Sequence, residues 1–117
     1  MSGIRRTLPN SHAAFVADAK VRDYLLNPQH PDNNGKATFF TSFGFSLHDW
    51  PKLAAALRKH ADAHAWRVTR IRPNPYGTRY EIRGPLESPD RSNPYVWSIW
   101  VIDPSNGNPR LVTAYPG

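Results

Sequence analysis

The chain has 117 residues, of which 39% are apolar, and carries a formal net charge of +6. This is the size of one domain, and four Trp, five Tyr and five Phe supply bulk for a core. The lack of cysteine excludes disulfides and thiolate metal sites, and no apolar run of about 18 residues is present to cross a membrane.

The N-terminal residues 1–12 are rich in turn formers and show no hydrophobic period, so we expect a flexible arm ahead of one domain at 13–117. Ala13–Leu26 then has apolar residues at helical spacing and predicts a helix, which Pro28 would end. Asp18 offers a later start as an N-cap, and in that case only the second half of this segment is helical.

Two more helices are predicted after a loop at 27–35, whose sequence NPQHPDNNG consists almost entirely of turn formers. Lys36–Phe43 has phenylalanines on one face, and Gly44 follows where a helix would end. The third helix begins with Ser46 and Asp49 spaced as a capping box. Its apolar stripe consists of Leu53, Ala56, Leu57 and Ala61.

From Trp66 onward the apolar residues alternate, which predicts strands. Short loops between them favour antiparallel pairing, and the third strand, apolar on both faces, should be central. The pattern predicts an α+β fold with N-terminal helices packed on a four-stranded antiparallel sheet. The four strands are expected at Trp66–Arg72, Thr78–Gly84, Tyr95–Asp103 and Arg110–Tyr115.

Common hydrolase and nucleotide-binding motifs, including G-x-S-x-G and the Walker A loop, are absent. His60 and His64 have the spacing of metal ligands on a helix, but two histidines alone do not hold zinc and no third ligand stands out. The surrounding sequence RKHADAHA is typical of the polar face of a surface helix. We therefore expect no metal site.

His30 and Lys36 lie in or beside the loop 27–35 and suggest a different chemistry. Metal-free RNA cleavage needs a base for the 2′-hydroxyl, an acid for the leaving oxygen and cations for the phosphate. Histidine can serve as base or acid near neutral pH, and Lys36 in the first turn of a helix would add its charge to the backbone N–H groups there. The alternative is that His30 is a solvated loop residue.

Residues 66–84 contain five arginines and one glutamate, a local excess that is typical of a surface for a polyanion. Arg70 and Arg79 are candidates for contacts with backbone phosphates, and Tyr76 and Tyr80 for stacking on bases. The alternative is that the tyrosines belong to the core and the arginines only solubilise an exposed strand.

The last predicted strand carries Thr113 and Tyr115. Alternation places both on one face together with Leu111. A hydroxyl pair beside a basic groove could orient a phosphate, so Thr113 is a candidate catalytic residue. The same residues are also ordinary in a strand.

The chain resembles an uncharacterised bacterial family of small toxin-like proteins in the segments LPN, YLLNPQHPDNNGKATFF, GF, PYGTRYEIRGPL, VWSIWVID and PRLVTAYPG. Members often lie beside a small partner protein or form the last module of a larger effector. The order of helices before a four-stranded sheet is similar to that of the barnase, EndoU, colicin D and RelE toxin nucleases, which typically cut RNA without metal. The resemblance implies site residues at His30, Lys36, Arg79 or Tyr80, and Thr113. EndoU-type sites use two histidines, and this sequence offers no clear second one.

These observations predict a toxin-like, metal-independent endoribonuclease that cleaves RNA by transesterification and needs no cofactor. An acidic antitoxin or immunity protein is the expected partner, and the cytoplasm is the expected site of action, with delivery as an effector as one route. The alternatives are a non-catalytic nucleic-acid- or protein-binding module with a basic face, and another toxin chemistry such as ADP-ribosyl transfer. The last would need a catalytic glutamate, and the chain has only Glu81 and Glu87.

Overall fold

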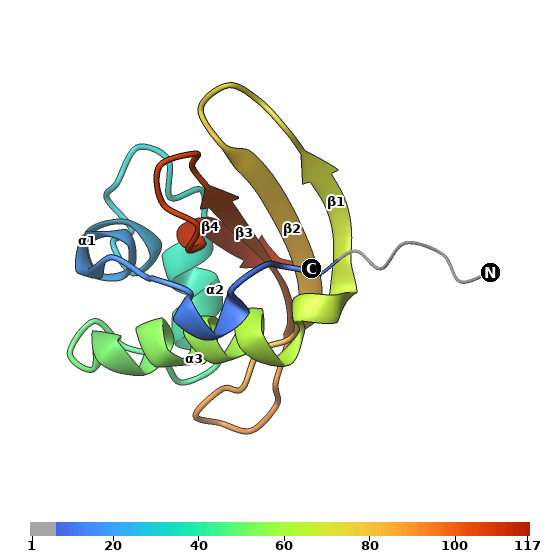
Figure 1. Cartoon of the computed structure of the whole chain (residues 1–117). Helices are drawn as coiled ribbons and strands as arrows, with labels where there is room; N and C mark the ends of the chain where they lie inside the picture. Colours follow the sequence, from blue (N-terminus) through green and yellow to red (C-terminus); the bar gives the residue numbers. More distant parts are fainter. Residues whose placement is uncertain (1–6) are drawn as a thin grey trace.

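The computed structural model describes residues 7–117, in which helices precede a sheet (Figure 1). The helical elements are η1 (Ser11–Ala13), α1 (Asp18–Lys20), η2 (Val21–Leu25), α2 (Lys36–Ser42), α3 (Trp50–Ala63) and η3 (Ala65–Arg67). The strands are β1 (Val68–Arg72), β2 (Thr78–Pro85), β3 (Tyr95–Ile102) and β4 (Arg110–Pro116). Within the described residues, no helix has the length and apolar character needed to cross a membrane.

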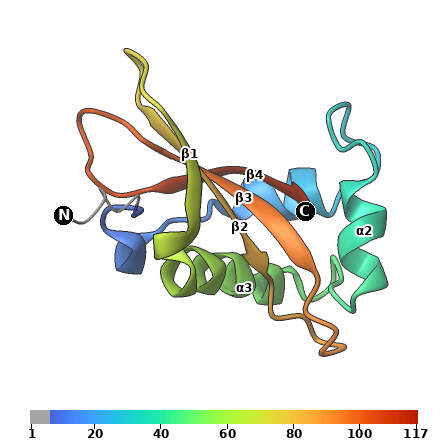
Figure 2. The same cartoon turned by 90° about the vertical axis from the view of Figure 1, so that its right-hand side faces the viewer.

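The four strands form one antiparallel sheet in the order β1-β2-β3-β4, so the predicted α+β fold with a meander is confirmed. The apolar strand β3 is internal, as expected. Figure 2 shows α3 lying along one face of this sheet. The core between them is built on Trp100 and Leu57, and it continues to Leu25 and Phe40 of the N-terminal helices.

The strand register sorts the sheet residues onto two faces, because directly paired residues in an antiparallel sheet share a face. Tyr80, Trp100 and Leu111 are paired in one row and face α3. We call the opposite side the outer face. Its rows are Arg72, Arg79, Val101 and Arg110; Arg70, Glu81, Ile99 and Thr113; and Arg83, Trp97 and Tyr115.

The expected N-terminal arm lies partly outside the described residues, and the part that is described, residues 7–12, packs on the domain. Leu8 is 1% exposed and its N–H donates to the Ala65 carbonyl at 2.9 Å. The Ser11 hydroxyl donates to the Asp62 carboxylate at 2.9 Å. A single buried leucine thus joins this segment to the core.

The helix predicted from Ala13 begins only at Asp18, which agrees with the later start and corrects the earlier one. Ala14 and Val16 are buried while Phe15 between them is exposed, and this alternation is that of a strand. Phe15 forms an isolated bridge with Arg110, so this segment covers the edge of β4. Pairing with a distant strand overrides the local helical spacing.

The expectation that Leu111 shares a face with Thr113 is wrong. Thr113 pairs with Ile99, but Leu111 pairs with Trp100, so Val112 is an extra residue in β4. Such a bulge reverses the alternation on one side of it, and Leu111 turns into the core. At the start of the sheet, Trp66 is part of the turn η3 rather than of β1.

Candidate active site

A pocket of about 550 Å³ lies where the N-terminal helices meet β4. His30 and Thr113, two of the three candidate catalytic residues, both line it although they are far apart in the sequence. The complete lining is Ala19, Lys20, Asp23, Tyr24, His30, Asp32, Val112 and Thr113.

Tyr24 is the side chain on which this site converges. Its hydroxyl lies 2.8 Å from the Thr113 hydroxyl, and its ring meets the His30 ring edge-on with 4.9 Å between the centroids. The Nζ atoms of Lys20 and Lys36 each lie 5.7 Å from the centroid of the same ring. The three candidate catalytic residues thus gather around a tyrosine that lies within the predicted helical segment Ala13–Leu26 and was not a candidate site residue.

The loop 27–35 is held in place by Asn33, which is 2% exposed. Its side-chain amide donates to the carbonyls of Tyr24 at 2.6 Å and Leu25 at 3.2 Å, and its side-chain oxygen accepts from the Ala37 N–H at 2.9 Å. One side chain therefore satisfies backbone groups at the end of η2 and at the start of α2, which have no partner within their own helices. The loop that carries His30 is consequently anchored at its base.

His30 is half-buried and has a defined tautomer. The Asp32 N–H donates to His30 Nδ1 at 3.0 Å, so Nδ1 carries no proton and the neutral ring is protonated at Nε2. This arrangement makes Nε2–H the group with which His30 can donate to a ligand.

Lys36 contacts Tyr24 but does not line the pocket. Its Nζ donates to the carbonyls of Asp32 and Asn33, both at 3.3 Å, and so closes the loop from the side of α2. Lys20, which was not among the candidates, lines the pocket instead. The sequence signal that would have found Lys20 is its position one helical turn before Tyr24.

Arg70 and Arg79 lie on the outer face, which also carries Thr113. Two strand spacings, about 10 Å, separate Thr113 from Glu81 along their row. The Glu81 carboxylate is the acid in the middle of the arginines, with Oε2 at 3.5 Å from Arg72 Nε and 3.6 Å from Arg79 Nε. Arg79 Nε is buried and forms no hydrogen bond with any of residues 7–117. Glu81 thus holds two guanidinium groups in place on a strongly basic face.

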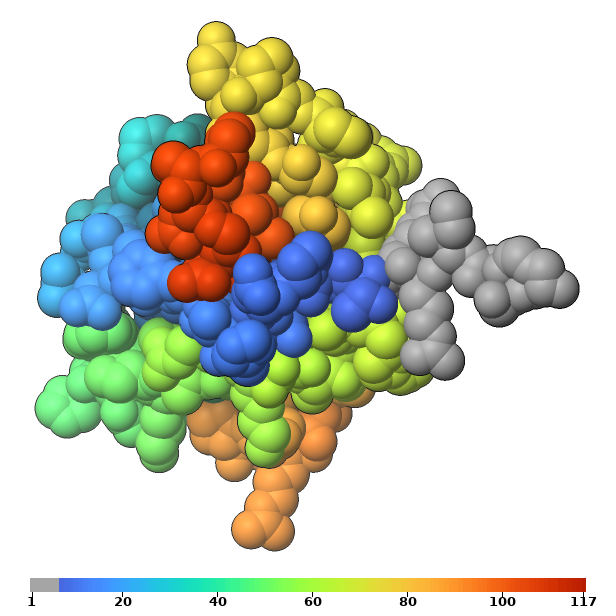
Figure 3. All heavy atoms as spheres, in the orientation of Figure 1, coloured from blue at the N-terminus to red at the C-terminus, as the bar shows by residue number. Residues whose placement is uncertain are grey.

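The two candidate stacking residues are not brought to this surface together. Tyr76 is 85% exposed in the loop between β1 and β2, which projects from the top of the molecule in Figure 3. Tyr80 lies in the row that faces α3 and packs against the core. Of the four candidates for substrate binding, only Arg70 and Arg79 share a face with Thr113.

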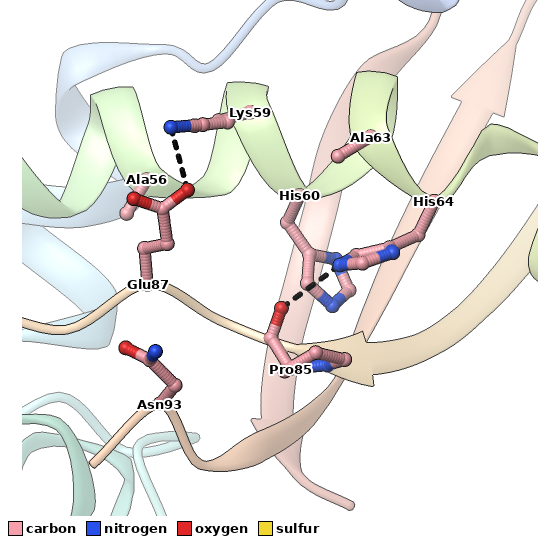
Figure 4. A pocket seen from close by; sticks show the side chains of 8 residues that line it. All are labelled: Ala56, Lys59, His60, Ala63, His64, Pro85, Glu87 and Asn93. Atoms are coloured by element: carbon pink, nitrogen blue, oxygen red, sulfur yellow. Dashed lines mark hydrogen bonds and ion pairs between the residues drawn. The ribbon is translucent and has the colours of Figure 1, made fainter. Parts of the chain in front are cut away.

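A second pocket, of about 170 Å³, is lined by His60 of α3 and by His64, which directly follows α3; both side chains point toward the end of β2 (Figure 4). His60 is 2% exposed, so its assignment to the polar face of a surface helix is wrong. The face of α3 that carries His60 packs on the sheet, where both nitrogens of the His60 ring find hydrogen-bond partners. Within residues 7–117, no three His, Cys, Asp or Glu side chains are grouped to hold a metal.

The hydrogen bonds around His60 form a chain with consistent donors. Trp100 Nε1–H donates to Ser98 Oγ at 2.8 Å, which leaves the Ser98 hydroxyl proton for His60 Nδ1 at 2.8 Å. His60 Nε2–H then donates to the Gly84 carbonyl at 3.0 Å. Burial lowers the pKa of His60 from 6.5 to about 4, against the opposing effect of the Gly84 hydrogen bond. His60 is therefore a neutral structural residue near pH 7.

A family model described as "Domain of unknown function (DUF6883)" matches residues 7–117. No curated protein matches the chain by sequence. A similar solved structure is a chain of the contact-dependent growth inhibition toxin and immunity protein complex from Klebsiella pneumoniae 342. The TM-score is 0.69 at 14% sequence identity, over 87% of this chain and 98% of that chain. At this identity the likeness shows a shared fold.

Proposed function

The chain belongs to the family described as a domain of unknown function (DUF6883), and from this premise and the site geometry we propose that it is a toxin-like endoribonuclease that needs no metal. The observation that carries the proposal is that His30 and Thr113 meet Tyr24 at the wall of one pocket, with Lys36 Nζ 5.7 Å from the centroid of the same tyrosine ring. An imidazole, hydroxyl groups and ammonium groups are the side chains that metal-free phosphoryl chemistry uses.

In the proposed reaction, the 2′-hydroxyl of RNA attacks the adjacent phosphorus and the 5′-oxygen of the next nucleotide leaves. The products are a 2′,3′-cyclic phosphate and a free 5′-hydroxyl. The 2′-hydroxyl proton passes to water, and the leaving 5′-oxygen takes a proton from water. His30 presents Nε2–H and therefore donates a hydrogen bond to a non-bridging oxygen of the phosphate. Lys36 contributes positive charge beside the site, and Thr113 orients the phosphate.

The outer face extends this site toward a longer substrate. Arg70 and Arg79 lie on the same face as Thr113 and would bind phosphates of the RNA strand beyond the cleaved one. Tyr76, at the tip of the β1–β2 loop, is free to stack on a base. Tyr80 is left out of this role because it packs against the core.

A toxin must be neutralised where it is made, so the proposal includes an acidic immunity protein or antitoxin that covers the basic outer face. The shared fold with a chain of a toxin and immunity protein complex supports this part. The cytoplasm, where the RNA target is found, would be the site of action.

The test is incubation of the protein with total bacterial RNA in EDTA, beside His30→Ala and His48→Ala. His48 is exposed and lies outside the pocket, which makes it a matched control. Wild type and His48→Ala should give fragments with 2′,3′-cyclic phosphate ends, and His30→Ala should leave the RNA intact. Intact RNA with all three proteins would overturn the endoribonuclease and favour a binding module.

A further inference from the structure

We infer that Lys20, Tyr24 and Thr113 form the subsite for the cleaved phosphodiester, with Lys20 rather than Lys36 as its cation and Tyr24 as a catalytic residue that touches the phosphate. This inference rests on the proposed function, because it names the contacts at the same pocket. It begins with the pair of hydroxyl groups on the pocket wall.

The Tyr24 and Thr113 hydroxyls lie 2.8 Å apart, and one of them donates to the other. Two hydroxyls carry two protons, so after this bond one proton remains for an outside acceptor. Both side chains are partly buried and both line the pocket. A hydrogen bond made there meets less competition from water than one on an open surface. The pair is thus prepared to donate to a non-bridging phosphate oxygen.

The two lysines near Tyr24 differ in what their ammonium groups already contact. Lys36 donates to two backbone carbonyls, at 3.3 Å each, and lies outside the pocket lining. Lys20 lines the pocket, and among the described residues it has no carboxylate within ion-pair distance. Both Nζ atoms lie at the same distance, 5.7 Å, from the Tyr24 centroid. Lys20 is therefore the ammonium group available to a ligand, and Lys36 stabilises the loop.

Two carboxylates also line the pocket, and they determine which phosphate suits it. Asp23 is paired with Arg22 at 3.3 Å, whereas Asp32 has no ion pair among the described residues. A dianionic phosphate monoester would be repelled more strongly by Asp32 than a diester with one negative charge. The pocket should accordingly prefer an internal phosphodiester to a terminal phosphate or to inorganic phosphate.

Binding can be measured apart from cleavage with a pentanucleotide of 2′-deoxynucleotides that carries no terminal phosphate, since it lacks the attacking hydroxyl. Its dissociation constant would be obtained by fluorescence anisotropy at low salt for wild type, Tyr24→Phe, Thr113→Val and Lys20→Met. Each variant should bind about tenfold more weakly, since hydrogen bonds to a charged group are typically worth about 1.5 kcal/mol or more. Lys52→Met on α3 and Tyr95→Phe are the matched controls and should bind within about twofold of wild type. Lys36→Met is measured beside Lys20→Met to compare the two ammonium groups.

Unchanged binding by Tyr24→Phe in a protein with a wild-type circular dichroism spectrum would overturn the subsite, as would a larger loss for Lys36→Met than for Lys20→Met. Competition by inorganic phosphate as strong as by the diester would overturn the preference for a diester. The two proposals fail separately. If wild type cleaves RNA and Tyr24→Phe binds and cleaves equally well, the subsite is wrong and the endoribonuclease stands. If the three variants lose binding while wild type leaves RNA intact, the subsite stands and the endoribonuclease is wrong.

Discussion

His60 should make the stability of the fold depend on pH between about 4 and 6.5. Its pKa is lowered by burial to about 4 in the folded protein, whereas the unfolded chain has the ordinary value of 6.5. As pH falls below 6.5, His60 becomes protonated in the unfolded state but stays neutral in the folded state until about pH 4. The free energy of unfolding therefore decreases across this pH range. The decrease in the free energy of unfolding should reach about 2 kcal/mol at pH 5 and about 3 kcal/mol at pH 4.

The assay is urea unfolding followed by tryptophan fluorescence at pH 7, 6, 5 and 4.5, with His60→Gln as the comparison. Glutamine can still donate to the Gly84 carbonyl and accept from Ser98, but it does not titrate. The variant should be less stable than wild type at pH 7, by about 1–3 kcal/mol. The difference in the free energy of unfolding between wild type and His60→Gln should then decrease by about 2 kcal/mol at pH 5, because only wild type carries the titrating His60. A difference in the free energy of unfolding that stays constant with pH would refute the role of His60 in the pH dependence.

Three other predictions concern the loop, a tight turn and the outer face. Asn33→Ala should lower the free energy of unfolding by about 2–3 kcal/mol and weaken RNA cleavage, because it leaves buried backbone groups unpaired at the base of the loop that carries His30; unchanged urea unfolding would contradict it. Gly77→Ala should destabilise by about 1–3 kcal/mol, since φ is +146° and a Cβ would lie 2.9 Å from the Ile102 carbonyl oxygen; a melting temperature equal to that of wild type would refute the strain. Arg79→Gln should reduce the salt dependence of oligonucleotide binding by about one phosphate contact, whereas Arg58→Gln on the exposed side of α3 should not. Equal slopes of log binding constant against log salt concentration for the two variants would exclude a specific role for the outer face.

The sequence by itself determined the type and order of α2, α3 and the four strands. The Pro- and Gly-rich breaks, the alternating segments and the apolar stripe of α3 are local signals, and all four strands lie within two residues of their predicted ends. The residue types for phosphate chemistry could also be selected this way. His30 and Thr113 are candidates by residue type alone, and both line the same pocket.

The tertiary structure decided which side chains meet, because distances between remote residues depend on how the strands and helices pack. The bulge at Val112 puts Leu111 and Thr113 on opposite faces of the sheet. The types of these residues alone do not predict this bulge. Tyr24 becomes the centre of the site only when η2 packs beside β4. His60 is polar in sequence and buried in the fold because Ser98 and Gly84 supply its partners from two strands. The residue types indicate which side chains can take part in phosphate chemistry, and long-range packing decides which of them lie together.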